Sequence, residues 1–456
     1  MTCNILTYGE IDRAEWSRLV RESATGTWFQ TPEAYDFFVS MPDLFKPFVV
    51  GIKGPTPNPS LKGGEEKPTS SLPSFQGRAG VRLQLRAVCS GYVTVDQNPI
   101  KQYFTRRAII IGGPALADDC TGEEVSELMK AIRNGAQWRN DTTPLVNGEL
   151  MSPIYIETRN FNDYSRWRSA FVAAGFAYQP HLNFHVDTSS VEAMWERMSE
   201  NRHRQLRRSD VDIIIIENKN KENTADAEKN SKNIIKHPSS APACGLHGLE
   251  CNQLQTPTSE LAASVVDYTL DMTLTNEAHP ECLSHGYDQS DKNMRDEEYI
   301  VVWYEILAEL YRTKVKTPLW PVEFFLEAYR QGVGKFMMVR HEGKIIGGSM
   351  VVVMSERVNE LRNEGCVYEW FECGLNSVYK DQYPSVMATY AGMLYAHEKG
   401  CRRYDMMGAG VPGVPYGVRD FKAEFGGEMV EHGRFLNVCK PLLYAIGKIA
   451  VKWMKE

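Results

Sequence analysis

Two hydrophobic patterns alternate along the first part of the chain. Short apolar or alternating runs predict strands, and apolar residues spaced three or four apart predict helices. The expected strands lie at 46–54, 81–91, 106–116 and 152–160, and the expected helices at 11–22, 122–140 and 161–176. Strands that alternate with helices are typical of a mixed α/β domain. We therefore expect one such domain over residues 1–180.

A second α/β domain is expected over residues 181–433. It opens with a strand-like segment at 182–187, and Ser189 and Ser190 are the candidate N-caps of the helix that follows. Helices are expected next at 297–314, 322–332 and 386–397, and strands at 335–354 (a hairpin), 366–374 and 401–407. The fold class is therefore α/β, with two domains in tandem.

Two polar segments interrupt this pattern. Residues 54–78 are dense in Pro, Gly, Ser and Lys, and residues 217–296 are polar apart from one weak apolar stretch. Neither segment can bury an apolar face. We expect a disordered insertion in a hairpin of the first domain and a flexible insertion in the second.

The C-terminal segment 434–456 is expected to form an amphipathic helix. Its apolar side carries Leu442, Leu443, Ile446, Ile449, Ala450 and Trp453, and lysines lie elsewhere. We expect this helix to pack back on the first domain. Peripheral contact with a membrane is the alternative that the same pattern leaves open.

The stretch from Tyr404 to Gly427 carries the candidate chemistry. It begins with a short strand after a buried-looking helix, and its glycines expose backbone N–H groups at the end of that strand. Lys422 stands between Phe421 and Phe425, which would hold a long cation in a semi-apolar setting. Such a lysine can contact a carbonyl, a phosphate or a developing negative charge, although a solvated lysine beside two core phenylalanines fits the same pattern.

The motif YDMMGAG followed by DFKAEFGGE resembles the C-terminal signature of the FemABX family, aminoacyltransferases that add residues to the peptide of peptidoglycan precursors. Other segments are similar to the same family in order: WFQTPEAYDFF, IIIGGPAL, LNFHVDTSSVEAMWERMSENRHRQLRR and EEYIVVWYEILAELYRTK. The resemblance implies two tandem domains of the GNAT (Gcn5-related N-acyltransferase) fold. It also places the family's active-site Phe-Lys pair at Phe421 and Lys422.

The resemblance implies an N-acyltransferase. Its donor would be aminoacyl-tRNA, as in Fem-type proteins, or acyl-CoA, and it would hold no tightly bound cofactor. The acceptor would be an amine on a cell-envelope or peptidoglycan precursor. The alternative is a catalytically degenerate GNAT-like protein that binds an envelope or polysaccharide intermediate without turnover.

Acyl transfer to an amine needs an activated ester or thioester, a deprotonated amine and stabilisation of a tetrahedral oxyanion. We expect Lys422 to stabilise the oxyanion or the leaving group, and Phe421 and Tyr416 to shape the pocket. The proton would pass to solvent or to a nearby carboxylate. Asp405 is, with Lys422, a candidate catalytic residue. Asp405 and Glu372 lie near the expected strand ends, and Asp405 can equally serve to anchor the loop.

A basic helix follows Ser190, and the resemblance implies that one of its arginines contacts the phosphates of the precursor. Arg202 and Arg204 are rival matches for that arginine. Three arginines fall on nearly one face: Arg197, Arg204 and Arg208. We expect Arg202, Arg204 and Arg208 to grip an anionic part of a substrate, and a solvated basic face is the alternative. The family's N-terminal phosphate-contacting lysine has no counterpart, because YDFFVSMPD lacks one before Lys46.

Composition limits the partners. A net charge of -7 and a pI near 5.9 argue against a DNA-coating surface. Scattered cysteines and no leader pattern indicate a reducing cytoplasm. No apolar run approaches the roughly 20 residues of a spanning helix, so we expect membrane association only at the inner face. Cys244, His247 and Cys251 are irregularly spaced within the polar insertion, so we expect no metal site.

Overall fold

The computed structural model describes residues 4–55, 83–135, 152–218, 234–236, 294–354 and 365–455. Most of the two expected insertions lies outside these ranges, as do Cys244, His247 and Cys251. The described residues correct the insertion boundaries. Gly54 and Pro55 still belong to a strand, where Pro55 pairs with Leu83, and a helix already begins at Asp296.

The first sheet is built mainly from the N-terminal part of the chain. Its spatial order is β1 (Asn4–Thr7), β2 (Phe45–Pro55), β3 (Leu83–Thr94), β4 (Ala108–Gly112), β6 (Tyr155–Asn160), β16 (Arg434–Val438) and β7 (Ala177–Gln179), and β5 (Ala115–Leu116) pairs with β3. The helices and turns of this domain are α1 (Arg13–Glu22), η1 (Trp28–Gln30), α2 (Pro32–Val39), α3 (Pro99–Thr105), α4 (Gly122–Arg133), η4 (Ser165–Trp167) and α5 (Arg168–Ala173). Strands β4 and β6 are parallel. The domain is therefore a mixed α/β layer structure, as its pattern predicts.

The second sheet has the spatial order β10 (Ile234–Lys236), β9 (Asp212–Ile216), β11 (Gly334–His341), β12 (Lys344–Met354), β13 (Cys366–Gly374), β14 (Arg403–Asp405), β8 (Leu182–Asp187) and β15 (Glu428–Glu431). Its helices are α6 (Val191–Arg197), α7 (Glu200–Arg208), α8 (Asp296–Leu310), η7 (Tyr311–Val315), α9 (Val322–Arg330), α10 (Pro384–Glu398) and α11 (Gly417–Ala423). Only β13 and β14 pair in parallel among the pairs of this sheet described here.

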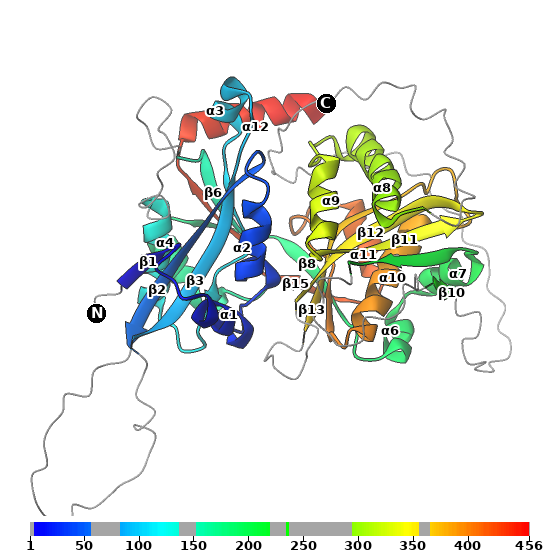
Figure 1. Cartoon of the computed structure of the whole chain (residues 1–456), viewed down its shortest axis with the longest axis horizontal. Coiled ribbons are helices and arrows are strands. Elements are labelled where there is room, and N and C mark those ends of the chain that lie inside the picture. The colour runs from blue at the N-terminus through cyan, green and yellow to red at the C-terminus, as the bar shows by residue number, and fades with distance from the viewer. Residues whose placement is uncertain are drawn as a thin grey trace, which may run out of the picture.

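The C-terminal segment differs from the expected single helix. Residues Arg434–Val438 form β16, which lies between β6 and β7 in the first sheet, and helix α12 (Pro441–Lys455) begins only afterwards. Phe435 and Leu436 are buried in this strand. RFLNV has no alternating pattern, because the adjacent Phe435 and Leu436 are both apolar and pack into two different buried clusters. In the sequence this short run therefore merges with the longer apolar pattern of the helix. Figure 1 shows α12 lying beside α3 at the end of the first domain.

The two domains share one continuous aromatic core. Helix α2 of the first domain faces α9 of the second (Figure 1), and ring pairs cross the boundary. Phe29 packs edge-on against Trp370 with ring centroids 5.0 Å apart, and Phe45 packs against Trp320 at 4.7 Å. Phe29, Phe45 and Trp320 belong to one buried cluster, and the partly buried Trp370 packs against it. Because such rings are large and buried on both sides, this interface fixes how the second sheet sits relative to the first.

Candidate active site

Strands β13 and β14 part at the centre of the second sheet. They pair over three positions that end with Tyr368 opposite Asp405, and β13 then continues to Gly374 without β14. The chain after Asp405 follows β8 instead, because the Met406 N–H donates to the carbonyl of Phe184. The backbone carbonyls of this diverging loop are left without the partners that a sheet would supply.

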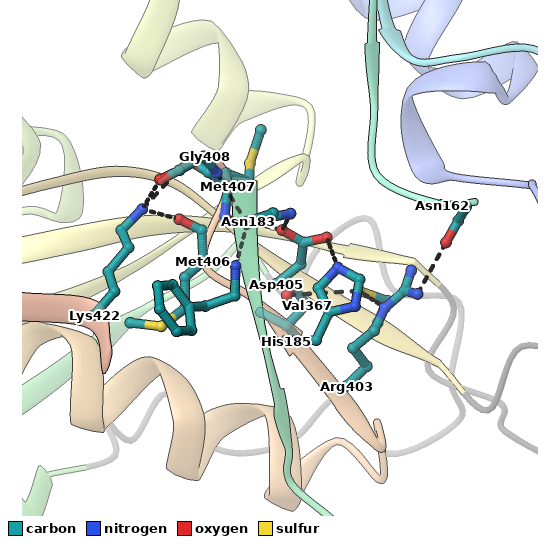
Figure 2. Close-up of polar contacts among 12 residues, drawn as sticks. Asn162, Asn183, His185, Val367, Arg403, Asp405, Met406, Met407, Gly408 and Lys422 are labelled. Atoms are coloured by element: carbon teal, nitrogen blue, oxygen red, sulfur yellow. Dashed lines mark hydrogen bonds and ion pairs between the residues drawn. The ribbon is translucent and has the colours of Figure 1, made fainter. Parts of the chain in front are cut away.

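Helix α11 supplies those partners from two basic side chains. The Lys422 ammonium donates to the carbonyls of Met406, Met407 (3.3 Å) and Gly408 (2.8 Å), which follow the end of β14 (Figure 2). One turn earlier, Arg419 donates to carbonyls of the same loop at Ala409 (2.9 Å), Val411 (2.5 Å) and Val414 (2.9 Å). The expected loop therefore contains a short helix whose cations hold the loop's own carbonyls.

Lys422 is only 8% exposed, so its ammonium is not a solvated surface charge. An ammonium has three N–H donors, and three carbonyls surround this one. Met407, whose carbonyl makes the longest contact, has a positive φ of 49°. A non-glycine residue in this conformation costs on the order of 1 kcal/mol or more and persists only when neighbours fix it.

Asp405 fixes the other side of the same turn. Its carboxylate is fully buried, and Oδ1 accepts from the Met407 N–H at 2.9 Å and from the Asn183 side chain at 2.7 Å. Oδ2 lies 3.1 Å from His185 Nε2 in an ion-pair contact. Burial favours the neutral acid, but His185, Arg403 and Asn183 outweigh it and lower the pKa of Asp405. These contacts place Asp405 beside the loop, and we propose that it anchors the loop instead of acting in catalysis.

A β-bulge in β13 adds two carboxylates to this place. Val351 pairs with Glu369 while the preceding Met350 pairs with Phe371, so Trp370 is an extra residue. An extra residue shifts the alternation of side chains by one. Trp370 and Phe371 consequently both pack toward the aromatic core on α9, and Glu369 and Glu372 both face the side of α10.

The two glutamates have different surroundings. Glu369 Oε1 accepts from Thr389 at 2.8 Å and from Tyr404 at 2.9 Å, whereas Glu372 Oε1 is buried without a hydrogen-bond partner. Burial, and then the neighbouring charge of Glu369, raises the pKa of Glu372 to about 8. The positive charge of Lys422 favours a lower pKa for both glutamates, so Lys422 lies near both of them. A carboxyl with a pKa near neutrality can exchange a proton with a substrate.

The cation between the two phenylalanine rings is Arg202, not Lys422 as expected. Its guanidinium carbon lies 4.4 Å from the ring centroids of both Phe421 and Phe425. The same group donates to the Phe421 carbonyl at 2.7 Å and lies 3.4 Å from the Glu424 carboxylate. Arg202 is 3% exposed, and burial lowers its pKa to about 10. This arginine therefore joins α7 to α11 and sets the position of the Phe-Lys pair.

The remaining predicted residues lie nearer to solvent. Arg204 is exposed and donates to Asn201 at 2.6 Å, and Arg208 is exposed beside Asp381. Of the two rival arginines, Arg204 is thus the one that a dissolved anion reaches. Tyr416 is half-buried and covers Gly410, where a Cβ would lie 2.9 Å from the Tyr416 ring.

The sequence pattern alone did not identify Glu369 or the bulge in β13. Their signal is visible in CVYEWFECG, where two glutamates stand three apart in an otherwise apolar strand. In a regular strand that spacing would put them on opposite faces.

Within the described ranges, no group of His, Cys, Asp and Glu side chains is arranged to hold a metal ion, and no helix has the length and apolarity needed to cross a bilayer.

Comparisons with known proteins point to the same region. The FemAB family model matches residues 361–452, which contain α10, β14, the loop and α11. The solved structure of FemX is 10% identical, covers 98% of this chain and 99% of that chain, and gives a TM-score of 0.53. A tandem GNAT protein from the clavulanic acid biosynthesis pathway is 9% identical over 95% and 98% of the chains, with a TM-score of 0.41. No curated protein matches the sequence.

These comparisons confirm two predictions. The match of the FemAB model to the segment with YDMMGAG and DFKAEFGGE confirms the resemblance to the FemABX family over that segment. The likeness to FemX along nearly the whole chain confirms the fold of two α/β domains, and at 10% identity it shows the fold alone.

Asp405 gives a stability prediction. Replacing it by Asn should lower the free energy of unfolding by about 3 kcal/mol at pH 7, because removing one partner of a buried ion pair leaves the other uncompensated. Urea unfolding measures this change. The folded-state pKa of Asp405 is lowered, so its contribution is present above the ordinary pKa near 4 and fades as the pH falls. The difference between the two proteins should shrink in acid.

Asp187→Asn is the matched control, because that carboxylate pairs with Arg197 at the surface. It should change stability by less than about 1 kcal/mol. An Asp405→Asn protein as stable as wild type but without activity would contradict the anchoring role and make Asp405 a catalytic group.

Proposed function

We propose that this protein is an N-acyltransferase that moves an acyl or aminoacyl group from an activated donor to an amine on a cell-envelope precursor. The observation that carries the proposal is the cluster of Lys422 and Glu372 where β13 and β14 part. In this cluster a buried ammonium lies near a carboxyl whose pKa is raised. The FemAB match covers both the loop and α11. It favours aminoacyl-tRNA as the donor, and acyl-CoA is the alternative.

Glu372 is the proposed general base. The acceptor amine attacks the donor carbonyl, a C–N bond forms, and the nitrogen then carries a proton that must leave. Glu372 Oε1, which is buried and has no hydrogen-bond partner, takes that proton. When the tetrahedral intermediate collapses, the C–O or C–S bond to the donor breaks and the leaving group receives a proton from Glu372 or water.

Lys422 is the proposed stabiliser of the oxyanion. As the carbonyl oxygen becomes negative, the ammonium exchanges its longest contact, the Met407 carbonyl at 3.3 Å, for that oxygen. Its contacts to Met406 and Gly408 hold it in place meanwhile. Because the site is buried, a fixed positive charge there acts more strongly than it would in water.

The exposed arginines of α7 are the proposed contact for the anionic part of a substrate. Arg204 and Arg208 face solvent on this helix, while Arg202 is committed to the two phenylalanine rings. Arg204 and Arg208 would thus bind phosphate, and Arg202 would position α11. Phe421 directly precedes Lys422 and Tyr416 lies at the start of the same helix, and both remain the proposed walls of the site.

A non-catalytic binding protein is the second candidate. The observation that favours it is that loop carbonyls accept hydrogen bonds from all three donors of Lys422, which a purely structural lysine would also show.

A direct assay separates the two candidate functions. The purified protein is incubated with an aminoacyl-tRNA mixture or with short acyl-CoA thioesters, and with a muramyl-pentapeptide precursor. A mass increase of the precursor supports the transferase, and no increase with any donor supports the binding protein.

Replacing Lys422 by Met should lower the single-turnover rate by roughly 10² or more, as the loss of an oxyanion donor does, while donor binding changes less. Lys422→Arg should not restore the rate, because a guanidinium is larger and directs its N–H groups differently. Rapid-quench kinetics at saturating donor measure both. Lys344→Met, at an exposed strand end, is the control and should keep the wild-type rate. A folded Lys422→Met protein with wild-type turnover would leave Lys422 only a structural role.

Glu372 gives a prediction about pH. A general base works in its deprotonated form, so the wild-type kcat/KM should rise with pH through about 8 and then level off. Glu372→Gln should remove this limb and lower the plateau by about 10². Glu369→Gln removes a charge that raises the pKa of Glu372, so it should move the limb to lower pH. An unchanged limb in Glu372→Gln would assign the proton transfer to another group.

A further inference from the structure

An apolar platform lies at the far end of the first domain, on helices α3 and α12. We define it by the exposed residues Tyr103 (48% exposed), Phe104 (42%), Leu442 (74%), Ile446 (46%) and Ile449 (59%). The two helices lie close together, because Phe104 lines the same small cavity as Leu443 and Tyr444. Figure 1 shows them side by side at this end of the molecule. The platform therefore joins residues from two distant parts of the chain.

Helix α12 is apolar on two opposite sides. Leu443 and Tyr444 pack on the first domain, where Tyr444 meets the ring of Tyr155 at 5.5 Å. Leu442, Ile446 and Ile449 follow at spacings of four and three residues, which places them on one face of the helix, and all three are exposed. A helix that packed only on its own domain would carry polar residues on that outer face.

The segment that contains α12 carries mostly positive charge, and its one acidic side chain is Glu456. The sequence from Lys440 to Lys455 contains four lysines and no acidic residue, Lys440, Lys448, Lys452 and Lys455, although the whole chain is acidic at -7. Lys440 lies 5.4 Å from the Tyr103 ring, so positive charge borders the aromatic part of the platform. Aliphatic and aromatic side chains surrounded by lysines match the apolar interior and anionic headgroups of a membrane surface.

We propose that the platform docks the protein on the surface of an anionic membrane. Leu442, Ile446 and Ile449 would enter the acyl boundary, Tyr103 and Phe104 would lie at headgroup depth, and the lysines would meet lipid phosphates. The helix would lie in the plane of the interface, and its 15 residues do not cross the bilayer. This docking is independent of the chemistry proposed above.

The test uses the full-length protein and vesicles of defined composition. Co-sedimentation with vesicles of phosphatidylglycerol and phosphatidylcholine is compared with sedimentation with phosphatidylcholine alone. Wild type should bind the anionic vesicles, and binding should weaken as salt rises. The double variant I446E/I449E should lower the partition coefficient about tenfold or more. The charge reversal K440E/K448E should lower it on anionic vesicles by a similar factor.

The control is V172E/M429E, which adds the same charges at exposed apolar residues elsewhere, on α5 and β15. It should bind the vesicles like wild type. This control and I446E/I449E should keep the wild-type thermal unfolding temperature, because their changed residues are exposed. The same measurement is made on K440E/K448E, in which Lys440 is half-buried. Equal binding of wild type and I446E/I449E would overturn the proposal. So would a wild type that ignores anionic vesicles, or one that forms a dimer in sedimentation velocity which I446E/I449E converts to monomer.

Discussion

The contact between the Lys422 ammonium and the carbonyls of residues 406–408 is the interaction on which the proposed site depends. Those carbonyls lose sheet partners because β14 leaves β13 after Asp405. Hydrogen bonds from a charged donor contribute about 1.5–3 kcal/mol each, so a single lysine can hold the whole turn. Arg419, three residues earlier on α11, extends the same arrangement along the loop. Helix α11 and the loop that follows β14 therefore form one structural unit.

This unit is held from three directions. Asp405 holds the turn from below, Arg202 holds α11 through the rings of Phe421 and Phe425, and the backbone of β8 holds the loop from the side. A further tie reaches the first domain, since Arg403 donates to Asn162 at 2.9 Å (Figure 2). Gly426 closes α11 against α6, where a Cβ would overlap the Arg197 carbonyl at 2.1 Å. Each tie uses a buried or strained group that only this arrangement satisfies.

The bulge in β13 shows why fold and chemistry are connected here. One extra residue at Trp370 turns two aromatic rings toward the domain interface and two glutamates toward α10. A regular strand would have placed Glu372 among aromatic rings, where a carboxyl without partners is costly. The same distortion thus completes the interdomain core and brings a carboxyl of raised pKa beside Lys422.

Local sequence patterns predicted much of the fold and part of the candidate site. Periodicity found most strands and helices, and the YDMMGAG and DFKAEFGGE motifs pointed to the segment that the FemAB model matches. Periodicity missed β16, because its five residues do not alternate and lie just before a longer amphipathic helix. Proximity in sequence suggested that Phe421 and Phe425 enclose Lys422. Only tertiary packing brings Arg202, over two hundred residues away in the chain, between those rings.

Hydrogen–deuterium exchange with a non-reactive donor analogue, such as an amide-linked aminoacyl-RNA or a thioether analogue of acyl-CoA, tests the location of the site most directly. If the donor lies where β13 and β14 part, the analogue should slow exchange in residues 368–374 and 405–410. Exchange in the first sheet should be unchanged. Protection confined to the first domain, by an analogue that binds, would contradict this account.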